Sequence, residues 1–171
     1  MKITKLLLLS VAVVLFSCNE DDDPKPNADG LVGTWAITAL DYQGTTTTTM
    51  ESLSIEANFT GTGKDMDLTT TFNSDPNTVT NEGSYTIVLT TTIMGQSSTQ
   101  EIIMDGVVTE GTWAVNGNTM TVTTSDGPQD ATIVEQTATT LKLKVEISES
   151  ESAQGMTVTT DIVGTYTFKK Q

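Results

Sequence analysis

Two pairs of carboxylates are the groups whose type and spacing could do chemistry. Asp65 and Asp67 are two residues apart, and so are Glu149 and Glu151. On a β-strand, residues at this spacing share one face and lie about 7 Å apart along the strand. Such pairs could bind calcium or act as the acid and base of a glycosidase. The simpler interpretation is a solvated strand face for the first pair and an acidic loop for the second, since Asp65-Met66-Asp67 lacks the spacing of an EF-hand loop.

The composition excludes most other catalytic chemistry. The chain of 171 residues has 22 acidic residues, 8 basic residues that are all lysines, no histidine and one cysteine, Cys18. Without histidine there is no Ser-His-Asp triad and no imidazole ligand for a metal. The net charge of -14 opposes binding to nucleic acid, where cationic side chains must neutralise phosphates. We therefore expect a protein that is not an enzyme and that uses no cofactor and no metal.

The N-terminus has the pattern of a secretory signal peptide over residues 1–17. Two lysines, Lys2 and Lys5, precede an uncharged apolar run at residues 6–16. Eleven helical residues would span only about 16 Å, roughly half of a bilayer's hydrocarbon core. A basic start and a short apolar run indicate a segment that is removed on export rather than a membrane-spanning helix.

The apolar run ends in Leu15-Phe16-Ser17-Cys18, which resembles the lipobox of bacterial lipoproteins. Phe16 is bulkier than the usual residue at its position, whereas Leu15, Ser17 and Cys18 match. The resemblance implies that Cys18 is lipidated and becomes the mature N-terminus. We therefore expect N-terminal acyl chains, each contributing about 0.8 kcal/mol per buried CH₂, to anchor the protein in the outer membrane.

An acidic run follows the cysteine directly: Asn19, Glu20, Asp21, Asp22 and Asp23. It resembles the export signal of Bacteroidetes-type lipoproteins, which implies a location on the outer face of the outer membrane. The alternative is a solvated acidic tether on a protein that faces the periplasm. Two prolines follow, Pro24 and Pro26, and predict a flexible tether over residues 18–30.

Residues 31–171 are predicted to form one all-β domain. The chain contains 35 threonines, which are β-branched and favour a pleated strand. Apolar residues recur with a period of two, most clearly at Leu141, Leu143, Val145 and Ile147. The sequence predicts about eight to ten antiparallel strands in an up-and-down barrel, with a two-sheet sandwich as the alternative.

Turn residues predict where the strands end. Asn116-Gly117-Asn118 supplies the positive φ of a tight hairpin that pairs Trp113 and Val115 with Met120 and Val122. A turn is also expected at residues 61–63, loops at residues 73–81 and 148–155, and a bend or bulge at Gly164. If the barrel closes, residues 34–40 must pair antiparallel with residues 164–169.

Four segments in order carry a family resemblance. They are Leu31-Val-Gly-Thr-Trp35, Gly111-Thr-Trp-Ala-Val-Asn-Gly-Asn-Thr-Met-Thr-Val122, Thr137-Ala-Thr-Thr-Leu-Lys-Leu143 and Gly164-Thr-Tyr-Thr-Phe-Lys169. Together they resemble the lipocalin-like domains of Bacteroidetes lipoproteins, which are relatives of the calycins. The resemblance implies an antiparallel barrel in which Trp35 plugs one end. Calycins place a basic residue of the last strand across that tryptophan, a role left here to Lys169 or Lys170.

The resemblance also implies a binding module for a small apolar ligand or a glycan. Residues expected to line a pocket are Trp113, Met66, Met120 and Tyr85, with ordinary core packing as the alternative. The packing of the barrel interior distinguishes a ligand-binding protein from one that binds a partner protein. No small ligand fits if the interior is filled by Leu141, Leu143, Val145, Leu53, Ile55 and Trp113. The second functional hypothesis is a protein-interaction module, such as an inhibitor or an accessory subunit of an outer-membrane complex.

Overall fold

The structure is a computed structural model that describes residues 26–171. A short helix precedes eleven strands: α1 (Ala28–Leu31), β1 (Gly33–Met50), β2 (Leu53–Lys64), β3 (Thr69–Phe72), β4 (Thr78–Glu82), β5 (Tyr85–Ile93), β6 (Gln96–Met104), β7 (Gly111–Asn116), β8 (Thr119–Thr124), β9 (Gly127–Gln136), β10 (Thr140–Ala153) and β11 (Met156–Lys170). Every strand pairing is antiparallel. The all-β prediction is therefore confirmed.

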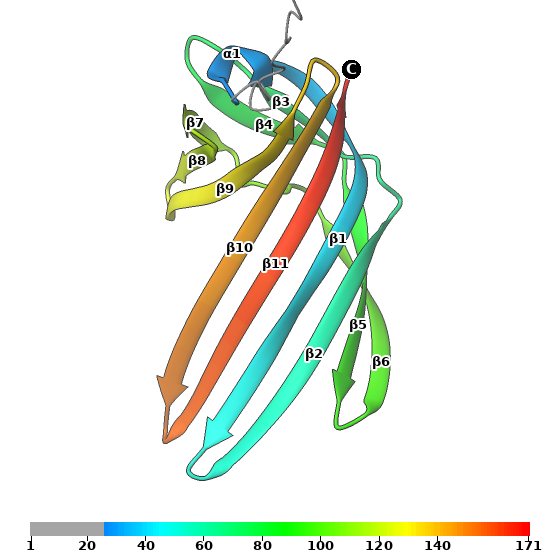
Figure 1. The fold of residues 1–171 in the computed structure, drawn as a ribbon, viewed down its shortest axis with the longest axis vertical. Coiled ribbons are helices and arrows are strands. Elements are labelled where there is room, and N and C mark those ends of the chain that lie inside the picture. The colour runs from blue at the N-terminus through cyan, green and yellow to red at the C-terminus, as the bar shows by residue number, and fades with distance from the viewer. Residues whose placement is uncertain (1–25) are drawn as a thin grey trace, which may run out of the picture.

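Eight of the strands close into a barrel. Their order is β11-β10-β9-β8-β7-β4-β3-β1, and the pairing of β1 with β11 completes the circle. Figure 1 shows these two strands side by side along almost their whole length. Apart from β2, β5 and β6, which lie outside the circle, strands that are consecutive in the sequence are neighbours in the barrel. This is the up-and-down topology. The barrel is thus confirmed, and the sandwich alternative is wrong.

The closing seam has the predicted pairing. Trp35 lies opposite Lys170, and Leu40 lies opposite Tyr166. The register shifts between Ile37 and Ala39, so the irregularity is in β1. The bend expected at Gly164 is wrong, because Gly164 stays in register with Tyr42. Its missing side chain instead leaves room for the Tyr166 ring, which a Cβ on Gly164 would approach to 2.8 Å.

The predicted hairpin at residues 116–119 is confirmed. Trp113 pairs with Val122 and Val115 pairs with Met120, while Gly117 adopts the positive φ that the turn requires. Both apolar pairs therefore lie on one face of the sheet. Of these residues, Trp113, Met120 and Val122 are buried in the core.

Three other turn predictions need correction. Residues 61–63 lie within β2, and the chain breaks from the strand at residues 65–68 instead, where Asp65 takes a positive φ. The expected loop at 73–81 is shorter, because Thr78–Glu82 forms β4. The expected loop at 148–155 is the end of β10, and the turn is confined to Gln154 and Gly155. Cross-strand pairs that a single segment does not reveal extend these strands.

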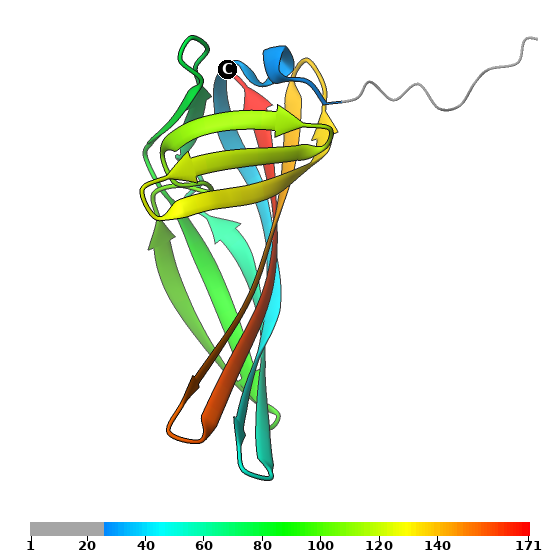
Figure 2. The same cartoon turned by 90° about the vertical axis from the view of Figure 1, so that its left-hand side faces the viewer.

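Six long strands continue past the closed barrel as an open, curved sheet. They are β10, β11, β1, β2, β5 and β6, joined in that order. Figure 2 shows β7, β8 and β9 crossing only one end of the molecule, and no strand of residues 26–171 closes the other end between β6 and β10. We call residues 44–63, 86–103 and 145–163 the open half, and the remainder of the barrel the closed half.

Hydroxyl ladders help to hold the open half in register. The Oγ1 atoms of Thr46 and Thr160 lie 3.1 Å apart, as do those of Thr90 and Thr99. Ser152 and Thr157 face each other in the same way at 2.9 Å. Such cross-strand hydroxyl pairs stabilise a sheet by roughly 0.2–1 kcal/mol each, which accounts for regular strands in segments with few large apolar residues.

The hydrophobic core lies in the closed half. Leu141, Leu143, Ile133 and Phe168 are fully or almost fully buried there. The N-terminal helix is docked at this end: the Asn27 backbone N donates to Gln136 Oε1 at 2.8 Å, and Gln136 Nε2 donates to the Asn27 carbonyl at 3.0 Å. Residues 27–30, expected to belong to the tether, are thus part of the folded domain.

Candidate functional site

The four residues expected to line a pocket belong to the hydrophobic core instead. Trp113, Met120 and Tyr85 are buried in the core of the closed half, and Met66 is half-buried against it. Trp113 is further held by its Nε1, which donates to the carbonyls of Asn73 at 3.0 Å and Thr78 at 3.2 Å. None of the four lines either of the two cavities described below.

Trp35 lies at the end of the barrel that carries α1. Its side chain is fully buried, and its Nε1 donates to the Leu31 carbonyl at 2.7 Å. Lys170 Nζ stands 5.0 Å from the ring centroid, which is a cation–π distance. Lys170 thus occupies the place expected for a basic residue of the last strand. The role of Trp35 as the plug of the barrel stays a prediction.

The two carboxylate pairs lie in other elements than the sequence predicted. Asp65 and Asp67 lie in the break between β2 and β3, not on a strand, and Asp65 is 3.9 Å from Lys64 Nζ. Glu149 and Glu151 lie on β10 rather than in a loop. Within residues 26–171, no three acidic, histidine or cysteine side chains come together as metal ligands. Cys18 and the acidic run at residues 19–23 lie outside the described residues.

The inner face of the open half carries exposed apolar side chains. Met50 lies opposite both Leu53 and Met156, and Ile147 lies opposite Ile162, all on the face that continues the core. Of the large apolar side chains in this sheet, Leu53 is 56% exposed and Ile55 is 40% exposed. Leu53 and Ile55 do not fill the interior, because no strand within residues 26–171 stands opposite them. Leu141, Leu143 and Trp113 do fill the closed half.

A cavity of about 960 Å³ lies where the closed half meets the open half. One wall is a run of five consecutive β10 residues, Val145 to Glu149. The facing wall comes from residues 105–110, between β6 and β7, and from residues 128–130 at the start of β9. Met104, Val107 and Val108 add apolar surface. The volume falls in the range of ligand sites, roughly 300–1,000 Å³.

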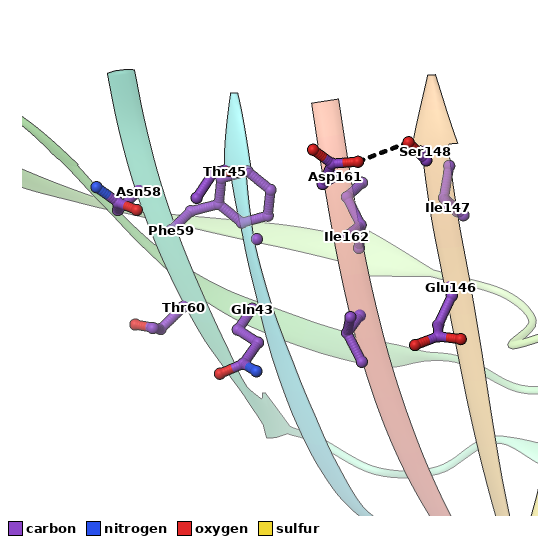
Figure 3. Close-up of a pocket in the computed structure, with 12 residues that line it drawn as sticks. Gln43, Thr45, Asn58, Phe59, Thr60, Glu146, Ile147, Ser148, Asp161 and Ile162 are labelled. Carbon is purple, nitrogen blue, oxygen red and sulfur yellow. Dashed lines mark hydrogen bonds between the residues drawn. The ribbon is translucent and has the colours of Figure 1, made fainter. Parts of the chain in front are cut away.

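A second, shallower groove of about 580 Å³ crosses β2, β1, β11 and β10 (Figure 3). Two rows of mostly polar side chains run across the strands, one of Thr60, Gln43, Val163 and Glu146, the other of Asn58, Thr45, Asp161 and Ser148. By register, both rows share the outer face of the sheet. Ser148 Oγ donates to Asp161 Oδ1 at 2.6 Å within the second row. Gly44 lies between the rows, where a Cβ would collide with the Phe59 ring.

Comparison with known families decides the classification. A family model described as a lipocalin-like domain matches residues 31–143. The chain belongs to this family. No curated protein and no solved structure gives a significant match. The match covers more than half of the chain and includes most of the barrel, so it agrees with the closed antiparallel architecture.

This lipocalin-like domain differs from a simple ligand-filled barrel in where its free space lies. The closed half is packed with side chains, and the free space begins at its mouth and continues along the open sheet. Among residues 26–171, no helix has the length and hydropathy to cross a membrane.

The open half of the lipocalin-like domain carries charges of one sign. Its charged residues are all acidic: Glu51, Glu56, Glu101, Glu146, Glu149, Glu151 and Asp161. Lys64, at the border, is engaged with Glu101 at 2.8 Å. Carboxylates beside exposed apolar surface create a negative potential that attracts cationic groups.

Sequence reasoning found the apolar residues of the open half but not their exposure. The period of two places Leu53 and Ile55 on one face, and this is correct. Within residues 26–171 that face lacks an opposing wall because β9 pairs with β10 only as far as Lys144 and then stays with β8. A signal was present in the uniform threonine and serine content of residues 45–49 and 148–152, which supplies few groups large enough to fill a core.

Proposed function

We propose that the protein is a lipid-anchored, non-catalytic binding module of the cell envelope. Acyl chains on Cys18 hold it in the outer membrane, and the acidic run at residues 19–23 directs it to the cell surface. The lipobox resemblance and the signal-peptide pattern support this address. In this proposal, residues 18–25 link the membrane anchor to the N-terminal helix that starts at Ala28.

The ligand is an apolar molecule that lies along the inner face of the open half. The observation that carries this proposal is a row of exposed aliphatic side chains on that face next to the 960 Å³ cavity. Exposed apolar patches rimmed by polar residues mark binding sites on monomeric proteins. Covering them releases about 25 cal/mol per Å² of apolar surface buried. Lipocalin-like domains as a family typically bind ligands, which agrees with this assignment.

A glycan is the second candidate, and the groove in Figure 3 favours it. The two rows across the sheet present amides, hydroxyls and carboxylates from Gln43, Asn58, Thr60 and Glu146. Sugar hydroxyls are recognised by such polar groups. The groove and the inner face lie on opposite faces of the sheet by register, so substitutions separate the two candidates.

Native mass spectrometry of the protein isolated from its own host tests the apolar ligand. We expect a small-molecule adduct on the wild-type protein and its loss from the double variant Leu53→Ser, Ile55→Ser. Ile103→Ser is the matched control, because Ile103 is 75% exposed but lies on the outer face of β6. An adduct retained by the double variant and lost from Gln43→Ala, Asn58→Ala would favour the glycan groove instead.

A further inference from the structure

We propose that the free edge of β10, from Val145 to Ala153, binds an extended apolar and basic segment of a partner protein as an added β-strand. This site goes beyond the ligand site proposed above, because it uses the backbone edge of the sheet rather than its inner face. A partner held in this way would extend the barrel wall into the opening between β10 and β6 (Figure 2).

The edge is long and lacks a neighbour. Strand β9 pairs with β10 only from Leu141 to Lys144, whereas β11 pairs with β10 along its whole length. In the described part of the chain, residues 145–153 therefore have a strand on one side only. An unpaired edge presents a row of N–H and C=O groups that can pair with another chain.

The alternation of the ladder identifies the free backbone groups. The Lys170 backbone N donates to the Thr139 carbonyl at 3.0 Å, which directs the backbone groups of Thr139 towards β11. Along an antiparallel strand, the backbone groups alternate between the two sides. The groups of Glu146, Ser148, Ser150 and Ser152 are therefore directed towards the open side, where a new strand would lie.

Space for a strand exists beside this edge. The cavity of about 960 Å³ is lined by Val145 to Glu149, and its far wall is formed by residues 105–110 and 128–130. A neighbouring strand lies about 4.8 Å from its partner. The cavity is therefore the gap that opens where β9 leaves β10, since residues 127–131 of β9 pair with β8 and not with β10.

The side chains of the edge define the chemistry of the partner. Val145 and Ile147 point to the inner face, followed on the same face by Glu149 and Glu151. Glu146 lies on the outer face, where its carboxylate is 3.0 Å from Lys144 Nζ, whereas Glu149 and Glu151 form no ion pair within residues 26–171. Opposite charges and apolar side chains directly across two strands stabilise the pairing. The complementary strand thus has apolar residues opposite Val145 and Ile147 and basic residues opposite Glu149 and Glu151.

A second copy of the chain does not fit this edge. Two β10 edges paired antiparallel would bring the acidic segments 146–151 of both copies together. Like charges on facing strands are destabilising. The occupant is therefore a basic segment of a different protein.

A synthetic peptide tests the proposal on the full-length protein in nanodiscs of neutral phosphatidylcholine, with empty nanodiscs as the blank. The peptide Val-Thr-Lys-Thr-Lys-Thr-Val-Lys-Val, laid antiparallel to β10, places lysines opposite Glu146, Glu149 and Glu151. We expect saturable binding that weakens with salt. A peptide N-methylated at the threonines opposite Ser148 and Ser150 keeps its charge but cannot pair, so it should bind at least about tenfold more weakly.

Two variants of one residue supply the matched control. Ser148→Pro removes a backbone donor on the free edge, where proline is tolerated in a sheet, and should weaken peptide binding about tenfold. Ser148→Ala loses only the hydroxyl bonded to Asp161 and should bind as the wild type does. Near-ultraviolet circular dichroism establishes that both variants are folded. Glu149→Gln, Glu151→Gln should weaken binding and reduce its salt dependence.

Equal binding of the N-methylated peptide, or of Ser148→Pro, would overturn strand addition, and so would absence of peptide binding. Self-association in analytical ultracentrifugation that Ser148→Pro abolishes would also overturn it, in favour of pairing between copies. The double variant Leu53→Ser, Ile55→Ser should still bind the peptide. The two proposals can therefore fail separately: Leu53→Ser, Ile55→Ser tests the apolar-ligand site, and Ser148→Pro tests the strand site.

Discussion

Lys170 Nζ lies 5.0 Å from the centroid of the Trp35 ring, where the last strand of the barrel meets the first. The two residues are also direct partners in the β1–β11 ladder. Gly33 allows this approach, since a Cβ there would lie 2.9 Å from Lys170 Cε. Backbone pairing, a buried indole and a cation over its face thus meet at the closure of the barrel.

Replacing Trp35 by alanine should destabilise the protein by about 3–5 kcal/mol, the range for a large aromatic removed from a core. The side chain is fully buried and its Nε1 is bonded to Leu31. Urea unfolding followed by circular dichroism measures the change. A loss below about 1 kcal/mol would be typical of a surface site and would contradict the role of Trp35 as a plug.

Lys170→Met should lower stability by about 0.5–1 kcal/mol, the usual range for a cation–π contact near the surface. Methionine retains much of the apolar stem and removes only the charge. Lys169→Met is the control, because Lys169 is exposed and lies on the same strand, β11. Equal effects of the two substitutions would show that the charge over Trp35 contributes nothing specific.

Stability should fall at high pH because of the tyrosines. Burial raises the pKa of Tyr85 and Tyr166 in the folded protein, and also that of Tyr42. An unfolded tyrosine titrates near pH 10. Since the folded pKa is the higher one, the stabilising effect is complete below about pH 10 and is lost as the pH rises above it.

The urea midpoint should therefore be level from neutral pH to about pH 9 and decline above about pH 10. Phenolate absorbance should appear in the folded protein only at higher pH than in the urea-unfolded chain. Tyr85→Phe should reduce the decline. Coincident phenolate titrations in the two states would contradict the assigned burial.

Cys18→Ala should abolish labelling by a clickable fatty acid and leave an unprocessed or soluble species, since the thiol is the expected site of acylation. Labelling followed by gel fluorescence measures this directly. Unchanged acyl incorporation would refute the lipoprotein assignment.

Replacing Asp21, Asp22 and Asp23 together by alanine should retain lipidation but move the protein from the cell surface to the inner leaflet. Protease treatment of intact cells distinguishes the two locations, because only surface-exposed protein is shaved. Equal shaving of the wild-type and triple-alanine proteins would leave no support for an export signal.

Local patterns in the sequence determined the class of the fold and much of its connectivity. The alternation in β10 and the Asn-Gly turn at residues 116–117 act between near neighbours, so a short window contains all the information that they need. Closure between residues 34–40 and 164–169 also followed from the sequence, because an all-β chain must either pair its terminal strands or leave open edges. The resemblance of the segment around Trp35 added the family.

The tertiary structure alone decided which apolar residues are buried. Leu53 and Leu143 both belong to alternating strands, yet Leu143 is buried and Leu53 is 56% exposed. Period two assigns a side chain to a face, but burial depends on a second wall that comes from strands distant in the sequence. In the open half the described chain provides no such wall, because β9 leaves β10 beyond Lys144 and pairs with β8 alone. The free edge of β10 and the exposed inner face are both consequences of this divergence of β9 from β10.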